Sequence, residues 1–240
     1  MAEAAGRRLL YRTAASFVPA YAGMDPRPLL TAEELVDDAT AAAAGAAGGL
    51  TVVGSYVPKT SEQLLAAEAA VDAWAVELDV AALVEAEGEE GAVDELVGRV
   101  TKKVETMLRG GHDVILYTSR RTAHADGAGG LRTGALVNGA LCDAVKGLGC
   151  RPRYLVAKGG ITSNDVAVRS LGVDRAVVRG QLLPGVPVWA LGPRSKYPGM
   201  NYVVFPGNVG GAGALAEALL KLGARPKGGA GGGSGSGARR

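Results

Sequence analysis

The sequence predicts an α/β protein with a mostly parallel sheet flanked by helices and an antiparallel portion at its C-terminal strands. Short apolar runs alternate with segments whose apolar residues repeat at helical spacing, a pattern typical of parallel strands with helices on both faces of a sheet. The last three apolar runs follow one another closely, which favours antiparallel pairing there. With 240 residues, 48% of them hydrophobic, the chain can form one sizeable domain, or one domain with a fragment of another.

Seven strands are expected from residue 50 onward, each a short run rich in apolar residues. They are 50–55, 74–80, 113–119, 153–160, 175–180, 186–191 and 201–207. Apolar residues at helical spacing predict helices over 93–108, 136–148 and 215–222, and a further helix follows Gly160 to about Leu171.

A helix is also expected between the first two strands. Thr60 and Gln63 have the spacing of a capping box, which predicts a helix start there and a helix running to about Trp74. Upstream, 9–23 begins like a strand, and Pro26 and Pro28 interrupt any regular element after it. This first piece is too short to form a core, so it is the end of something preceding it or an edge strand.

Charge and composition exclude several classes of function. The net charge of +2 offers no basic surface for nucleic acid, and no apolar run approaches the roughly 20 residues that span a membrane. The N-terminus lacks the apolar core of a secretory signal, so we expect a cytoplasmic protein, although its arginines leave organelle targeting open. Two cysteines, Cys142 and Cys150, lack metal spacing and indicate a structural role in a reducing compartment.

Four strand-to-helix turns carry the main functional signal. They are rich in glycine or hydroxyl residues and occupy 54–60, 118–122, 158–165 and 206–213. Glycine lets backbone N–H groups approach an anion, and a helix N-terminus adds partial positive charge. A single such turn is more often only a capped turn. Because ligands bind at the carboxyl ends of parallel strands, four of them at one sheet edge favour a phosphate-rich ligand.

The familiar nucleotide motifs are absent. No G-x-x-x-x-G-K-[ST] loop exists, and no G-x-G-x-x-G follows a first strand. Other polar residues are expected to have structural roles. His112 and His124 are expected to be surface residues, and Asp165 is expected to be an acid that suits the first turn of a helix rather than a magnesium contact. Arg120 and Arg121 follow a strand and are either phosphate contacts or solvated side chains.

Five segments together resemble the nucleotide-binding, C-terminal domain of the four-carbon acid sugar kinases. They are "VVGSYVPKTSEQ" (52–63), "LYTSR" (116–120), "KGGITSNDVAVRSLGV" (158–173), "GQLLPGVPVW" (180–189) and "YPGMNYVVFPGNVG" (197–210). The resemblance covers roughly residues 50 to 225 with the motifs in family order. "GGITS" and "FPGNVG" are more similar to the plant and fungal branch, since bacterial relatives often have an acid at the position of Ile161.

The resemblance implies ATP-dependent phosphorylation of a sugar acid such as threonate or erythronate, with Mg²⁺ as a further cofactor. The family's ATP contacts fall here on residues of three turns: Ser55, Gly159, Gly160, Ile161, Thr162 and Gly207. Such a site would act by positioning and charge neutralisation. One departure is Val57, where bacterial relatives often have a second serine.

The same resemblance divides the chain. Residues 1–35 are expected to be the end of an N-terminal sugar-acid-binding domain, of which 9–18 carries the likeness, and 36–49 a low-complexity linker. Residues 50–225 form the nucleotide-binding domain, and 226–240 a disordered Gly/Ser-rich linker, typical of a connection to a further fused domain. With most of the substrate domain missing, no catalytic base is visible and the chain alone would be inactive.

Two alternatives remain open at this stage. One is a non-catalytic nucleotide-binding or scaffold module of a fusion protein. The other is a nicotinamide-dependent enzyme, which the alternating pattern allows and the missing fingerprint disfavours.

Overall fold

One seven-stranded sheet organises the chain, in a computed structural model that describes residues 9–14, 16–25, 27–35, 47–119 and 128–228. The strand order is β2-β3-β1-β4-β7-β6-β5. Their bounds are β1 Leu50–Val53, β2 Ala73–Leu78, β3 Asp113–Thr118, β4 Leu155–Lys158, β5 Ala176–Leu183, β6 Val186–Leu191 and β7 Asn201–Phe205.

The pairing confirms the predicted fold class. β2, β3, β1, β4 and β7 are parallel to one another, whereas β6 is antiparallel to both β5 and β7. Each parallel strand is followed by a helical segment that returns the chain to the opposite edge, as parallel pairing requires.

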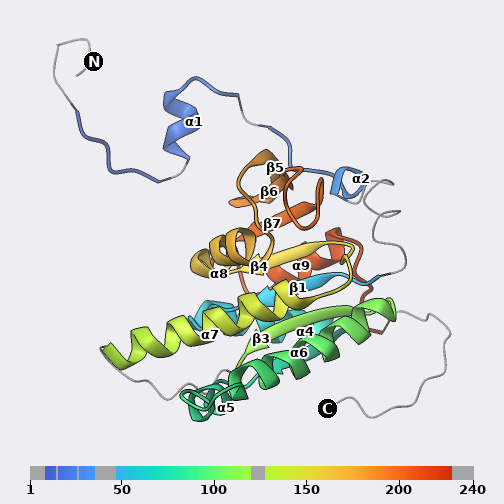
Figure 1. The fold of residues 1–240 in the computed structure, drawn as a ribbon. Coiled ribbons are helices and arrows are strands. Elements are labelled where there is room, and N and C mark those ends of the chain that lie inside the picture. The colour runs from blue at the N-terminus through green and yellow to red at the C-terminus, as the bar shows by residue number, and fades with distance from the viewer. Residues whose placement is uncertain (1–8, 15, 26, 36–46, 120–127, 229–240) are drawn as a thin grey trace.

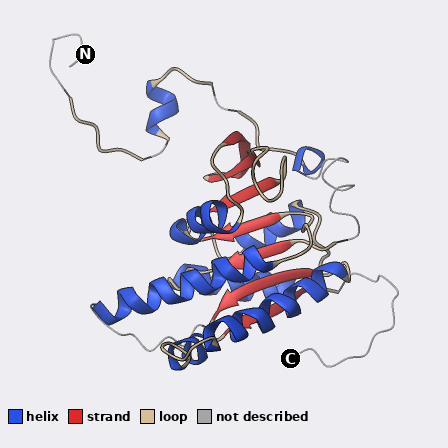
Figure 2. Ribbon diagram, in the orientation of Figure 1, coloured by secondary structure: helices blue, strands red, loops and turns tan. Residues whose placement is uncertain are grey.

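Helices cover both faces of the sheet (Figures 1 and 2). One face carries α5 Val80–Glu85, α6 Ala92–Arg109, α7 Ala128–Gly147 and α8 Gly160–Asp165, which continues as a π-helical turn, Val166–Ser170. The other carries α4 Pro58–Ala70 and α9 Ala214–Lys221. Successive strand residues point to opposite faces of the sheet. Val52 therefore packs in the core under the α5–α8 face, and Val53 packs in the core under the α4/α9 face. No helix among the described residues is both long and apolar enough to cross a bilayer.

Three local expectations were wrong. The chain at 9–23 forms no strand among its described residues but a short helix, α1 Phe17–Tyr21, which stands apart from the sheet (Figure 1). The N-cap of α4 is Val57 rather than Thr60, three residues earlier than expected, because Pro58 suits the first helical position, and the helix ends at Ala70 rather than Trp74. Thr60 and Gln63 therefore lie inside the helix and make no capping box.

The N-terminal segment that precedes the low-complexity stretch does contain a capping box. Thr31 N–H donates to Glu34 Oε2 at 2.8 Å, and Glu34 N–H donates to Thr31 Oγ1 at 3.3 Å, which starts α2 Ala32–Leu35. Leu30 N–H donates to the Gln181 carbonyl of β5 at 2.9 Å. Asn201 Nδ2 of β7 donates to the Leu35 carbonyl at 2.8 Å.

Leu30 and Leu35 are consequently buried in the core on the α4/α9 face. Whatever domain residues 1–35 derive from, the part from Leu30 to Leu35 is packed on the nucleotide-binding domain predicted at 50–225.

We therefore expect Leu35→Ala to lower the free energy of unfolding of the whole domain by about 2–4 kcal/mol, because it leaves a cavity in this core. Chemical denaturation measures the change. Leu29→Ala is the matched control, since Leu29 is exposed, and it should cost less than about 0.5 kcal/mol. Equal, small effects of the two variants would show that this segment does not fold with the sheet.

Candidate functional site

The carboxyl ends of β1, β4 and β7 lie side by side. Val53 of β1 is in register with Lys158 of β4, which is in register with Phe205 of β7. The turns that leave these three strands therefore start from one row at the same edge. The turn after β3 begins beside them at Ser119, whose side chain hydroxyl accepts the Val80 N–H. Arg120, Arg121 and His124 lie outside the described residues.

Two glycines open the turn after β4 in different ways. Gly159 has φ +119°, which favours glycine, and a Cβ there would lie 3.0 Å from Ser55 Cβ. Its N–H donates to the Phe205 carbonyl at 2.9 Å. Gly160 has an ordinary φ, and nothing lies within 4 Å of where its Cβ would be. Gly159 thus brings three strand ends together, and Gly160 leaves open space in front of them.

Close packing also explains the first glycine of the turn after β1. A Cβ at Gly54 would overlap the hydroxyl of Thr162, whose side chain is buried. The hydroxyl of the next residue, Ser55, accepts a hydrogen bond from Thr60 Oγ1 at 3.2 Å. A Cβ at Gly207 would lie 3.3 Å from Ser55 Oγ. Ser55 is therefore the residue at which the turns after β1, β4 and β7 meet.

The start of α8 presents backbone donors at this edge. The first intrahelical-type bond runs from Ser163 N–H to the Gly159 carbonyl at 2.8 Å. Within the described part of the chain, the N–H groups of Gly160, Ile161 and Thr162 have no backbone acceptor, as is usual at a helix start. Ile161 is 74% exposed, so its side chain lies on the open side of the turn.

The turn after β7 is held by side chains of α4. Thr60 Oγ1 donates to the Gly207 carbonyl at 3.3 Å, and Gln63 Nε2 donates to the carbonyls of Val209 and Gly211 at 2.9 and 2.8 Å. Both side chains are fully buried. Their spacing, which had predicted a capping box, instead places both on the helix face that meets this loop.

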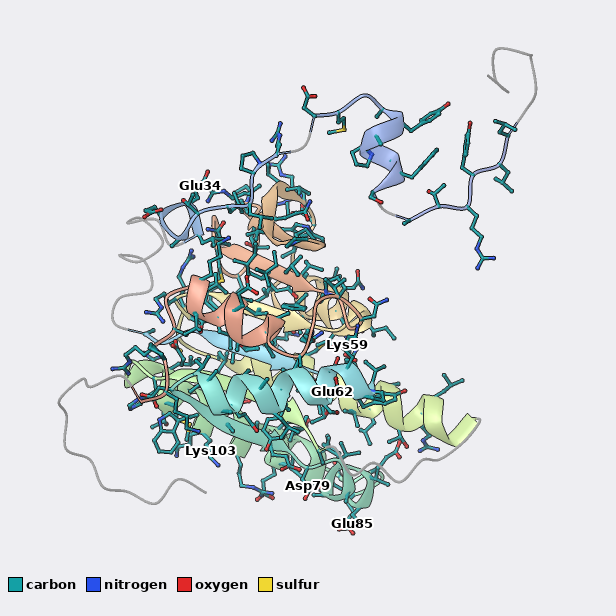
Figure 3. All side chains as sticks on the ribbon, turned by 180° about the vertical axis from the view of Figure 1, so that it is seen from behind. Glu34, Lys59, Glu62, Asp79, Glu85 and Lys103 are labelled. Carbon is teal, nitrogen blue, oxygen red and sulfur yellow. The ribbon has the colours of Figure 1, made fainter. Side chains whose placement is uncertain are left out.

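Two lysines complete the contacts to the same turn. Lys158 Nζ donates to the carbonyls of Pro206 and Gly207 at 2.9 and 3.3 Å, and lies 4.4 Å from the Phe205 ring centroid. Lys59 Nζ, at the first turn of α4 (Figure 3), donates to the Asn208 carbonyl at 3.3 Å. Burial, with a smaller contribution from the charge of Lys59, lowers the pKa of Lys158 to about 8.

Acidic side chains contribute little to this edge. Asp79, after β2, caps α5 by accepting the N–H groups of Ala81 and Ala82. Asp165 ends α8, one turn later than predicted, and accepts hydrogen bonds from Asn138 and Asn164. No cluster of three or more His, Cys, Asp or Glu side chains suited to a metal occurs in the described part of the chain. His112 is exposed, as predicted, and both cysteines are free.

The structure brings the predicted site residues to one place. Ser55, Gly159, Thr162 and Gly207 meet where the three turns join, and Gly160 and Ile161 form the open side of the same turn. Sequence reasoning missed the roles of Lys59, Thr60, Gln63 and Lys158. One signal was available: Lys158 is a lysine at the end of an otherwise apolar strand, next to two glycines.

A parallel sheet whose glycine turns meet at one carboxyl edge defines a class of α/β domain that binds phosphate-bearing ligands there. The chain belongs to the family of nucleotide-binding C-terminal domains, whose sequence model matches residues 50–215. This confirms the resemblance to the C-terminal domain of the four-carbon acid sugar kinases. The assignment to a plant and fungal branch stays a prediction.

Solved structures share the fold at low sequence identity. A Bordetella bronchiseptica domain of unknown function (DUF1537), solved with citrate as a domain-swapped dimer, has a TM-score of 0.57 at 21% identity over 75% of this chain and 42% of that one. A Salmonella typhimurium LT2 protein described as a putative tRNA synthase has a TM-score of 0.57 at 18% identity, over 72% of this chain and 40% of that one.

The chain therefore spans about two fifths of the length of these structures. No curated protein matches the sequence.

The two adjacent glycines at 159 and 160 make a matched test of this geometry. Gly159→Ala should lower the free energy of unfolding by about 1–3 kcal/mol, because alanine is strained at φ +119° and crowds Ser55. Gly160→Ala meets open space at a helix start, so its effect should stay within about 0.5 kcal/mol. Thermal or chemical denaturation distinguishes them, and equal losses would contradict the roles given to the two glycines.

Proposed function

We propose that the turns after β1, β4 and β7 bind the phosphate chain of ATP, through Ser55, Gly159, Gly160, Ile161, Thr162 and Gly207. The observation that carries the proposal is the meeting of these turns around Ser55, beside the open space in front of Gly160. The three N–H groups at the start of α8 lack backbone acceptors within the described residues and supply donors for phosphate oxygens. Membership of a nucleotide-binding family supports the same ligand.

The reaction proposed is transfer of the γ-phosphoryl group of ATP to a hydroxyl of a four-carbon sugar acid such as threonate or erythronate. In this chemistry a protein contributes mainly positioning and charge neutralisation. The described residues do not fit a magnesium site of their own, because no acidic cluster lies among them. The metal would arrive with the nucleotide phosphates.

The sugar acid and the base that accepts its hydroxyl proton are assigned to a separate N-terminal substrate domain. The chain spans only about two fifths of the structures that share its fold, which leaves room for such a domain. The chain is thus proposed to be the ATP-binding portion of a cytoplasmic kinase, inactive until the substrate domain is supplied.

Gly160→Val tests the nucleotide site. We expect at least a tenfold loss of ATP affinity, about 1.4 kcal/mol, because the valine fills the space in front of the phosphate-binding turn. Isothermal titration calorimetry measures it. Gly98→Val, in α6, is the control: nothing lies within 4 Å of its Cβ position either, and ATP affinity should not change. An unchanged affinity in Gly160→Val would reduce the motif to a structural turn.

A second experiment tests whether ATP binding and sugar-acid phosphorylation require different domains. The chain alone should bind ATP and show no sugar-acid phosphorylation. Adding the substrate domain of a related kinase, in trans or by fusion, should produce phosphorylated four-carbon acid, detectable by coupled ADP release. ATP binding without any turnover in the fused protein would instead support a non-catalytic nucleotide-binding module.

A further inference from the structure

Lys158 occupies a position that its neighbours fill with apolar residues. Val53, Lys158 and Phe205 form one row across β1, β4 and β7, on the face covered by α4 and α9. All three are completely buried. An aliphatic side chain would extend the core at this position, and burying an ammonium group there costs free energy.

The charge of Lys158 has no partner of opposite sign. Its hydrogen-bond acceptors are the Pro206 and Gly207 carbonyls, and no carboxylate of the described residues pairs with it. The charged group that acts on it is Lys59 of α4, which is also positive. A buried charge without a counter-ion is unusual in a structural position, and it is the arrangement found where a protein awaits an anion.

The contacts of Lys158 also decide how the β7 turn is oriented. Lys158 donates hydrogen bonds to the carbonyls of Pro206 and Gly207. Thr60 also donates to the Gly207 carbonyl, and Lys59 donates to the Asn208 carbonyl. In a trans peptide the N–H points opposite to the carbonyl of the same unit, and no peptide bond of the described chain is cis. The N–H groups of residues 207, 208 and 209 are therefore directed away from these side chains.

Those three N–H groups have no hydrogen-bond acceptor within the described part of the chain. Successive N–H groups that point out of a turn form an anion-binding concavity. The turn after β7 thus has free donors in front and a buried positive charge behind.

We propose that Lys158 is the positioning cation of the nucleotide site: it holds the carbonyls of residues 206 and 207 so that the following N–H groups face the phosphates, and its charge is neutralised by them. The inference rests on the proposed function and deepens it. If Lys158 has this role, nucleotide binding is coupled to protonation of the Lys158 amine.

The sign of the pH dependence follows from the lowered pKa of Lys158, about 8 in the free protein. A bound phosphate stabilises the ammonium and raises that pKa, so above pH 8 nucleotide binding must first protonate the amine. Affinity should fall by about tenfold per pH unit above pH 8 until the pKa of the complex is reached. Near pH 8 to 9, binding should take up a fraction of a proton.

The experiment is calorimetric titration of the chain with ATP, ADP and adenosine at pH 7 and at pH 9.5, repeated in two buffers of different ionisation enthalpy. We expect Lys158→Met to weaken ATP and ADP at least tenfold at pH 7, and adenosine less than twofold. Wild-type affinity for ATP should fall at least tenfold at pH 9.5, with proton uptake, whereas the variant should show neither.

Lys196→Met is the matched control. Lys196 also donates to two backbone carbonyls, those of Val145 and Lys146, and burial also lowers its pKa, although Lys196 is half-buried whereas Lys158 is fully buried. It lies in the loop that leads from β6 to the start of β7, against the C-terminal end of α7, whereas the candidate site is at the carboxyl end of β7. Its substitution should leave ATP affinity and its pH dependence unchanged.

Four outcomes would overturn the proposal. If Lys158→Met binds ATP as wild type does, or loses adenosine as much as ATP, Lys158 has only a structural role while the nucleotide site stands. A wild-type affinity for ATP that does not change between pH 7 and 9.5 overturns it without any variant, should Lys158→Met fail to fold. No ATP binding by the wild-type chain would overturn both this inference and the proposed function.

Discussion

The parallel pairing of β4 with β1 on one side and β7 on the other is the constraint on which the candidate site depends. It places Val53, Lys158 and Phe205 in one row, so that three turns far apart in sequence leave the sheet at neighbouring points. Gly159 N–H then bonds the Phe205 carbonyl, and Ser55 touches the other two turns. A shift of register by one residue would separate these turns and turn Lys158 to the other face.

The hydrogen bonds that side chains donate to backbone carbonyls shape the site as much as the glycines do. A loop that leaves a buried strand must find donors for its carbonyls. At the β7 turn those donors are side chains of Lys59, Thr60, Gln63 and Lys158, and the N–H groups of residues 207–209 have no backbone acceptor among the residues that the structure describes. The proposed binding capacity of this edge thus depends on which donors of the neighbouring elements bond these carbonyls.

The glycines of the motifs serve two purposes that the sequence does not separate. Gly54 and Gly159 are required because Thr162 and Ser55 occupy the space of a side chain, so they act in packing. Gly160 adjoins open space and an ordinary backbone conformation, so its missing side chain matters only to something that enters the site. The two glycines of "GGITS", Gly159 and Gly160, thus have different physical roles.

The sequence alone determined the fold class and the order of most strands and helices along the chain, and it pointed to the glycine turns that we propose as the ligand site, because hydrophobic periodicity and glycine placement are local signals. It also identified the family by its motifs. It misplaced the start of α4 and took Thr60 and Gln63 for a capping box, because three-residue spacing serves both a helix end and a helix face. Only the tertiary structure decided that these side chains and Lys158 hold the β7 turn, since contacts between residues about 50 to 150 positions apart leave no local pattern.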